Sequence, residues 1–194
     1  MDTRLEDRAA IADLMTSWMH RDLGEWDQLR ELFHPDATVE ITWFEGSASD
    51  FIDGSQRMGA SDLRTKHLIA SPAITFNGDR ALVQTNAMIV AENTALELGC
   101  NAHNRFWDRV EKRDGVWRIA RRESSYDMSC FTFLGRVQEV DQETVRRYPR
   151  EYAALAYLLE RSGFHISREF PTRGSQLEAD MKAAGTAWLN EQDD

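Results

Sequence analysis

Residues 114–127 read DGVWRIARRESSYD, and this stretch decides the fold prediction because it joins a tight turn to a long strand. Asp114-Gly115 is a dipeptide typical of hairpin turns. The segment from Val116 to Phe131 after it is predicted to be a strand. With a period of two, Arg122, Ser124 and Tyr126 share one face, and Trp117, Ile119 and Arg121 share the other.

Three further β-like segments precede this strand, and short turns separate them. They span residues 65–76, 80–93 and 96–112. Asn77-Gly78, between the first two, is a strong signal for a hairpin. The four segments together predict a long antiparallel meander.

The N-terminal third is predicted to be mainly helical. A capping box at Thr3–Glu6 opens a first helix that ends near His20–Asp22. Further elements are a second helix at 25–33 stopped by His34-Pro35, a strand at 38–43 and a short helix at 48–51. Helices followed by a curled sheet predict the α+β class. We expect a cone-shaped α+β barrel, with a curved antiparallel sheet wrapped around the N-terminal helices and enclosing a cavity.

The pattern changes near residue 138, so we expect a barrel domain at 1–137 and a helical C-terminal extension at 138–194. One helix opens at Tyr148-Pro149. Ser175 caps another. Their apolar faces are Tyr152, Leu155 and Leu159 in the first, and Leu177, Met181, Ala184 and Trp188 in the second. Such faces are normally buried. The extension is therefore expected to cover the barrel, close its mouth or bind another subunit, and we expect a homo-oligomer, either a dimer or a trimer.

Composition excludes several classes of function. The formal net charge of −10 disfavours a nucleic-acid partner, because phosphate binding needs a basic surface. No apolar run is long enough to cross a membrane, and the first residues do not resemble an export signal, so we expect a cytoplasmic protein. In that compartment Cys100 and Cys130 are expected to be free thiols.

No nucleotide, metal or nucleophile motif occurs in the sequence, so we expect no cofactor and no metal. Asp22 is unusual because an acid is disfavoured at a helix C-terminus, although a solvated helix-end acid is the simpler reading. His67 on its strand is either a base or a hydrogen-bonded structural histidine. Arg122 either faces a cavity with an anionic partner or pairs with acids on the outer face. His103, Asn104 and Arg105 are weaker candidates, because periodicity does not tell which one faces inward.

The stretch from Arg4 to Tyr126 resembles the SnoaL-like branch of the nuclear-transport-factor-2-like superfamily. The resemblance rests on the helix ending at Asp22, "LRELFHPD" (29–36), "ATVEITW" (37–43), His67, and "DGVWRIARRESSYD" (114–127). It is similar to the scytalone dehydratases and hexachlorocyclohexane dehydrochlorinases of that superfamily, which are cofactor-free. The resemblance implies that Asp22 and His67 form the base and that Arg122 is a pocket arginine.

The resemblance predicts a cofactor-independent lyase for a small hydroxylated aromatic or alicyclic compound. His67 would take a proton in an elimination or a retro-aldol-type cleavage, and Asp22 would orient it. Arg122 would hold the leaving group or a developing oxyanion. We expect the substrate to contact Trp18, Trp43, His103, Ser124 and Tyr126. Two alternatives stay open: a ketosteroid-type isomerase, and a non-catalytic ligand-binding or assembly module like the small subunit of a ring-hydroxylating dioxygenase.

Overall fold

The computed structural model describes residues 4–191 of the 194-residue chain. Thr3, the predicted cap of the first helix, lies outside the described residues. The helices are α1 (Leu5–Thr16), α2 (Met19–Leu23), α3 (Trp26–Glu31), α4 (Ala48–Gly59), α5 (Gln142–Val145), α6 (Ala153–Arg161) and α7 (Gln176–Asn190). The strands are β1 (Phe33–Ile41), β2 (Phe44–Ser47), β3 (Leu63–Ile69), β4 (Ala73–Asn77), β5 (Arg80–Asn93), β6 (Leu98–Arg113) and β7 (Val116–Phe133).

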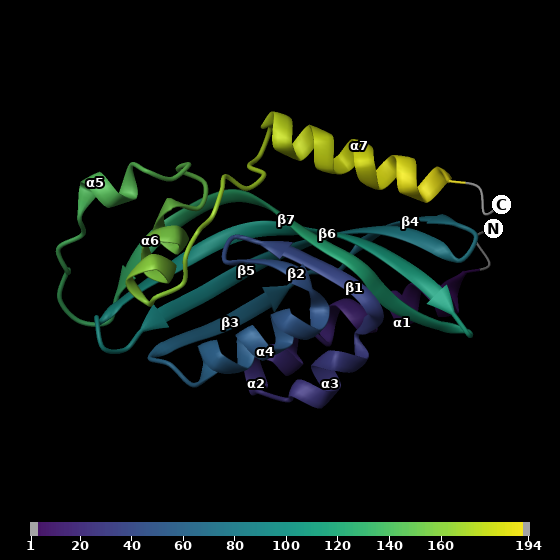
Figure 1. Cartoon of the computed structure of the whole chain (residues 1–194), viewed down its shortest axis with the longest axis horizontal. Helices are drawn as coiled ribbons and strands as arrows, with labels where there is room; N and C mark the ends of the chain where they lie inside the picture. The colour runs from purple at the N-terminus through teal and green to yellow at the C-terminus, as the bar shows by residue number, and fades with distance from the viewer. Residues whose placement is uncertain (1–3, 192–194) are drawn as a thin grey trace.

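The strands form one curved sheet in the order β2-β1-β7-β6-β5-β3, and β4 also pairs with β5. β1 and β7 are parallel, and the other pairs are antiparallel. The α+β class and the cone-like architecture are confirmed, but the sheet is not closed, because its edge strands β2 and β3 do not pair with each other. Helices α1 to α4 lie together against one face of the sheet, below it in Figure 1.

The main hydrophobic core fills the space between these helices and the sheet. Trp18 stacks on Phe51 with ring centroids 5.6 Å apart, and it also contacts Phe33 and Phe106. All four side chains are buried. Aromatic rings bury large areas at little cost in side-chain entropy, so this cluster anchors the short helices to the sheet.

The predicted first helix is in fact two helices. α1 ends at Thr16 and α2 begins at Met19, and Gly24, with φ of +71°, ends α2 in a left-handed conformation. Helical periodicity alone does not reveal such a break, because the apolar side chains continue through it. Because of this break, Asp22 lies on the separate five-residue helix α2.

Two predicted strands have different limits in the structure. β1 starts at Phe33 rather than at residue 38, and its register with β7 shifts between Phe33 and Thr38, which accommodates Pro35. The predicted strand at 65–76 is two strands, because β3 pairs with the second half of β5 and β4 with the first half. Pro72 lies between them, and it has no amide hydrogen to donate to a ladder.

A β-bulge at Ala120 overturns the predicted division of β7 into two faces. Arg121 pairs with Arg109 and Ile119 with Val110, which leaves Ala120 as an extra residue. An extra residue reverses the alternation of side chains beyond it. Ile119 and Arg122 are therefore both buried on the core side, although an unbroken strand would place them on opposite faces.

Helix α6 packs across the end of the sheet formed by β5, β6 and β7 (left in Figure 1). Its side chains Leu155 and Leu159 are buried in a second apolar cluster, which also includes Tyr126 of β7. The extension therefore covers one end of the cone within the same chain.

Helix α7 lies on the opposite face of the sheet from α1 to α4, above β4, β5 and β6 in Figure 1. Ser175 caps it as predicted, accepting a hydrogen bond from the amide of Glu178. Leu177 and Ala184 of the predicted apolar face are exposed in the single chain. The buried residues are Glu178, Met181, Gly185 and Leu189. On this buried face Glu178 pairs with Arg105, its Oε1 lying 2.6 Å from the guanidinium Nη1.

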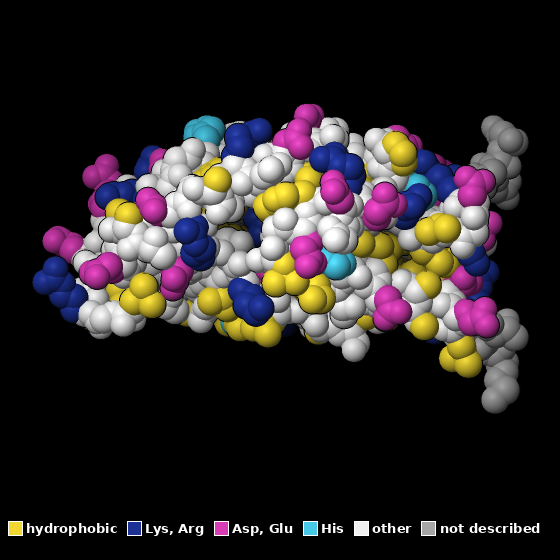
Figure 2. All heavy atoms as spheres, turned by 90° about the horizontal axis from the view of Figure 1, so that it is seen from below, with side chains coloured by type: hydrophobic (Ala, Val, Ile, Leu, Met, Phe, Trp, Pro, Cys, Tyr) yellow, Lys and Arg dark blue, Asp and Glu magenta, His cyan; other side chains and the backbone are white. Residues whose placement is uncertain are grey.

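Lys/Arg and Asp/Glu side chains are interspersed on the face that carries α2, α3 and α4, as Figure 2 shows, so this face has no continuous basic surface. Among residues 4–191, no helix is both long and apolar enough to span a bilayer. Cys100 is buried and Cys130 is exposed, and both are free thiols, as expected.

Candidate active site

Asp22 and His67 are in direct contact through two hydrogen bonds. The Nδ1 of His67 lies 2.7 Å from Oδ1 of Asp22, and the backbone amide of His67 donates to Oδ2 at 2.6 Å. Both side chains are buried. With Nδ1 donating to the carboxylate, the other ring nitrogen, Nε2, carries the lone pair. The pair therefore has the orientation that a general base requires.

Burial and neighbouring charges set the protonation of this pair. Burial lowers the pKa of His67, and the positive charges of Arg21 and Arg122 lower it further, while Asp22 raises it. Burial raises the pKa of Asp22, but the hydrogen bonds from His67 and the positive charges of His67 and Arg21 together outweigh burial, and the net pKa is lowered. At neutral pH the pair is thus a neutral imidazole on a carboxylate, which is ready to accept a proton.

His67 lines a narrow cavity of about 30 Å³ between the sheet, α2, α4 and α6. This cavity is also lined by Trp18, Trp43 and Tyr126, which were predicted to contact the substrate. The remaining lining residues are Arg21, Ile41, Thr42, Met58, Thr65, Ile89, Asn104, Phe106, Leu155 and Leu159. This volume holds about one or two water molecules. Side chains must therefore move before a larger molecule can reach His67.

Of the three neighbouring candidates on β6, Asn104 is the residue that faces the cavity. Its Nδ2 donates to Ser124 at 2.8 Å, and its Oδ1 is buried without a hydrogen-bond partner among the described residues. Ser124 is buried behind it and is not one of the lining residues, contrary to expectation. His103 is exposed and does not line this cavity, although it was predicted to contact the substrate. Strand alternation separates it from Asn104.

The structure does not place Arg122 on the cavity surface as predicted. Its guanidinium lies 4.2 Å from the ring centroids of both Trp18 and Phe106, whose side chains line the cavity. Asp108 accepts hydrogen bonds from its Nε at 2.7 Å and its Nη2 at 2.9 Å. Arg122 and Asp108 are thus a buried ion pair behind the cavity wall, and Arg122 acts on His67 only through its charge.

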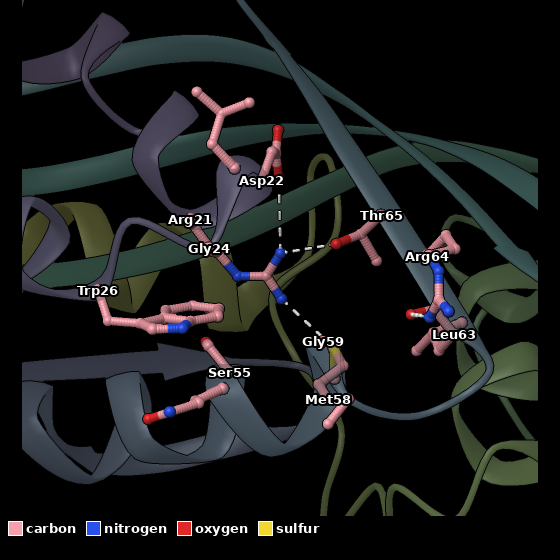
Figure 3. A pocket seen from close by; sticks show the side chains of 13 residues that line it. Arg21, Asp22, Gly24, Trp26, Ser55, Met58, Gly59, Leu63, Arg64 and Thr65 are labelled. Atoms are coloured by element: carbon pink, nitrogen blue, oxygen red, sulfur yellow. Dashed lines mark hydrogen bonds and ion pairs between the residues drawn. The ribbon is translucent and has the colours of Figure 1, made fainter.

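The cation that lines the cavity is Arg21, which sequence reasoning missed. It donates to the hydroxyl of Thr65 at 2.8 Å and contacts the sulfur of Met58 at 3.3 Å, as Figure 3 shows. Burial lowers the pKa of Arg21 to about 10, so it stays cationic at neutral pH. Nothing in the local sequence marks it, because arginines near helix ends are usually exposed.

Comparison with known proteins supports the fold. Residues 3–123 match the SnoaL-like domain. Pea pathogenicity protein 2 of Fusarium vanettenii is 29% identical over 180 residues, covering 88% of this chain and 77% of that protein. A scytalone dehydratase candidate from Novosphingobium aromaticivorans superposes with a TM-score of 0.60 at 23% identity, covering 73% of this chain and 97% of its own.

The hexachlorocyclohexane dehydrochlorinase LinA-type3 of Novosphingobium barchaimii has a TM-score of 0.57 at 19% identity, covering 71% of this chain and 96% of its own. At these identities the structural likeness concerns the fold alone. The family match extends over more than half of the sequence and contains both Asp22 and His67. The chain therefore belongs to the family of SnoaL-like domains.

Proposed function

We propose that the protein is a cofactor-independent lyase that eliminates water from a small β-hydroxy carbonyl compound with an aromatic or alicyclic ring. The observation that carries the proposal is the 2.7 Å contact between Asp22 and Nδ1 of His67, on a buried histidine that lines a narrow cavity. A carboxylate in this position fixes the tautomer of a histidine and stabilises the imidazolium that forms.

The reaction is a proton transfer followed by loss of hydroxide. Nε2 of His67 takes the proton from the carbon next to the carbonyl, and the C–H electron pair forms an enolate. The enolate then forms the C=C bond as the C–O bond to the β-hydroxyl breaks. The imidazolium returns its proton to the departing hydroxide, so that one water leaves and His67 is neutral again. Asp22 balances the imidazolium charge between the two steps.

The cavity also offers a position for the hydroxyl of such a substrate. The unpartnered Oδ1 of Asn104 is a hydrogen-bond acceptor in an otherwise largely apolar wall. A buried acceptor without a partner costs free energy, and a substrate hydroxyl would remove that cost. Such a group also favours hydroxylated over unsubstituted rings.

Product mass tests the proposal directly. The full chain is incubated with a panel of β-hydroxy ketones fused to aromatic or alicyclic rings, each with and without a carboxylate on the ring, and the masses of the products are measured by mass spectrometry. We expect loss of one water in the presence of the protein and no loss with His67→Ala. His103→Ala, a histidine change on the outer face, is the matched control and should retain activity. A product of unchanged mass would instead identify an isomerase, and no turnover of any panel member would contradict the proposal.

A further inference from the structure

A second, larger pocket of about 410 Å³ adjoins the cavity at His67, between α2, α4 and the start of β3. Three side chains, Arg21, Met58 and Thr65, line both spaces. Figure 3 shows the Arg21 guanidinium between Thr65 and Met58, with dashed contacts to both. The guanidinium is thus part of the wall between solvent and His67.

Arg21 has weak compensation for a buried cation. Its hydrogen-bond partners are a hydroxyl and a thioether, neither of which is charged. The carboxylate nearest to it, Asp22, is 3.7 Å away, and both oxygens of that carboxylate already accept hydrogen bonds from His67. A buried charge needs close, directed partners to offset its loss of hydration. The guanidinium therefore retains capacity for an anion.

The outer pocket is positive, although the chain as a whole carries a charge of −10. Its lining has two cations, Arg21 and Arg64, and a single acid, Asp22. Arg64 donates to the backbone carbonyls of Ser61 and Leu63 rather than to an acid. The positive charge of the lining favours entry of anions over neutral or cationic molecules.

Two further features of the lining fit an aromatic ligand with a polar end. The indole of Trp26 forms one side of the pocket. The hydroxyl of Ser55 is buried in the lining and has no hydrogen-bond partner among residues 4–191. An unpaired buried hydroxyl points to a polar group on whatever fills the pocket.

We propose that Arg21 is the anion-binding residue of the substrate site, and that the protein acts on small aromatic carboxylates that enter through the outer pocket. The substrate carboxylate replaces Thr65 and Met58 as partner of the guanidinium, which opens the wall to His67. Thr65 and His67 point to the same side of β3, so an anion held at Arg21 places the rest of the molecule beside the base. Turnover of the bound carboxylate rests on the proposed lyase function, whereas anion binding at Arg21 does not.

The test uses benzoate and benzamide as probes, because they have nearly the same shape and differ in charge. Isothermal titration of the full chain gives both affinities. We expect benzoate to bind about tenfold or more tightly than benzamide, as a charge-assisted hydrogen bond predicts. Equal affinity, or no binding of either probe, would overturn the inference, and this comparison needs no variant.

Variants then show which residue causes the preference for benzoate over benzamide. Arg21→Gln should abolish the preference for benzoate. Arg64 is the other arginine of the same pocket, so Arg64→Gln is the matched control. In that variant the ratio of benzoate affinity to benzamide affinity should stay at least about a third of the parent's ratio, because an exposed charge is screened. Should Arg21→Gln fail to fold, Arg21→Lys keeps the charge and should retain a preference while weakening benzoate binding, because a lysine lacks the forked donors. A folded Arg21→Gln variant with an unchanged preference would overturn the assignment.

His67→Ala separates this inference from the proposed function. Benzoate binding should survive that change, because the ring is not the anion's partner. A protein that prefers benzoate through Arg21 yet eliminates water from no compound would contradict only the lyase. A lyase with no preference for benzoate would contradict only the role of Arg21.

Discussion

Nδ1 of His67 lies 2.7 Å from Oδ1 of Asp22, and the amide of the same histidine donates to Oδ2 at 2.6 Å. One residue thus holds both oxygens of the carboxylate. Rotation of the imidazole or of the carboxylate breaks at least one of these bonds, so the ring is fixed with Nε2 as the free base.

Replacing His67 by alanine should lower kcat at least about a hundredfold, which is the lower end of the contribution of a positioned general base. The measurement is steady-state kinetics on a compound that the protein is shown to turn over. His103→Ala should lie within about twofold of the parent, because surface changes away from a site have little effect. Equal losses in both variants would contradict a specific role for His67.

Asp22→Asn should keep the shape of the site and still lose much of the rate, because an amide does not balance the imidazolium charge. The loss in the double variant Asp22→Asn/His67→Ala should be close to that of His67→Ala alone, since groups that act as one unit are not additive. Losses that multiply in the double variant would show that the two residues act independently.

The pH dependence of kcat/KM should show an acidic limb below 6.5, the ordinary value for histidine, because burial lowers the pKa of His67 in the free protein. The base works only when neutral, so the rate is flat near neutrality and falls as pH drops through that lowered pKa. Arg21 also lowers the pKa of His67. Arg21→Gln should therefore move the limb to higher pH, and a shift to lower pH would contradict the charge coupling.

The buried pair of Arg122 and Asp108 should behave as one structural unit. Asp108→Leu leaves an unpaired buried guanidinium and should destabilise folding by about 3–5 kcal/mol. Arg122→Met combined with Asp108→Leu should cost less than Asp108→Leu alone, because no charge is then left without a partner. Urea unfolding of the parent, the single and the double variant measures this, and a double variant less stable than the single one would refute it.

We propose that the extension after Val137 is needed for solubility. It supplies Leu155 and Leu159 to the cavity wall. A chain that ends at Val137 would expose this wall, and large exposed apolar patches promote association. Gel filtration should show aggregation or a changed oligomer size. A soluble truncated protein with unchanged assembly state and full activity would show that the extension is dispensable.

Several parts of the fold could be predicted from short stretches of sequence alone. Asp114-Gly115 lies between β6 and β7 as expected, and both of its residues have positive φ. The predicted hairpin at Asn77-Gly78 is present, but Asn77 is the last residue of β4 and pairs with Arg80, so the loop itself is Gly78-Asp79. β5 has the predicted limits of 80–93, and Ser175 caps α7. These features depend on neighbouring residues only, namely turn conformation, alternation and capping, and such information is present in a short stretch of sequence.

The sequence by itself determined the class of the fold and, through its resemblance to a family, the pairing candidates Asp22 and His67. Only the tertiary structure decided which side chains share the cavity. The bulge at Ala120 turned Arg122 inward, and the packing of α2 against β3 buried Arg21. The physical reason is that the direction of a side chain depends on register shifts and on contacts between residues far apart in the chain, which no local pattern encodes.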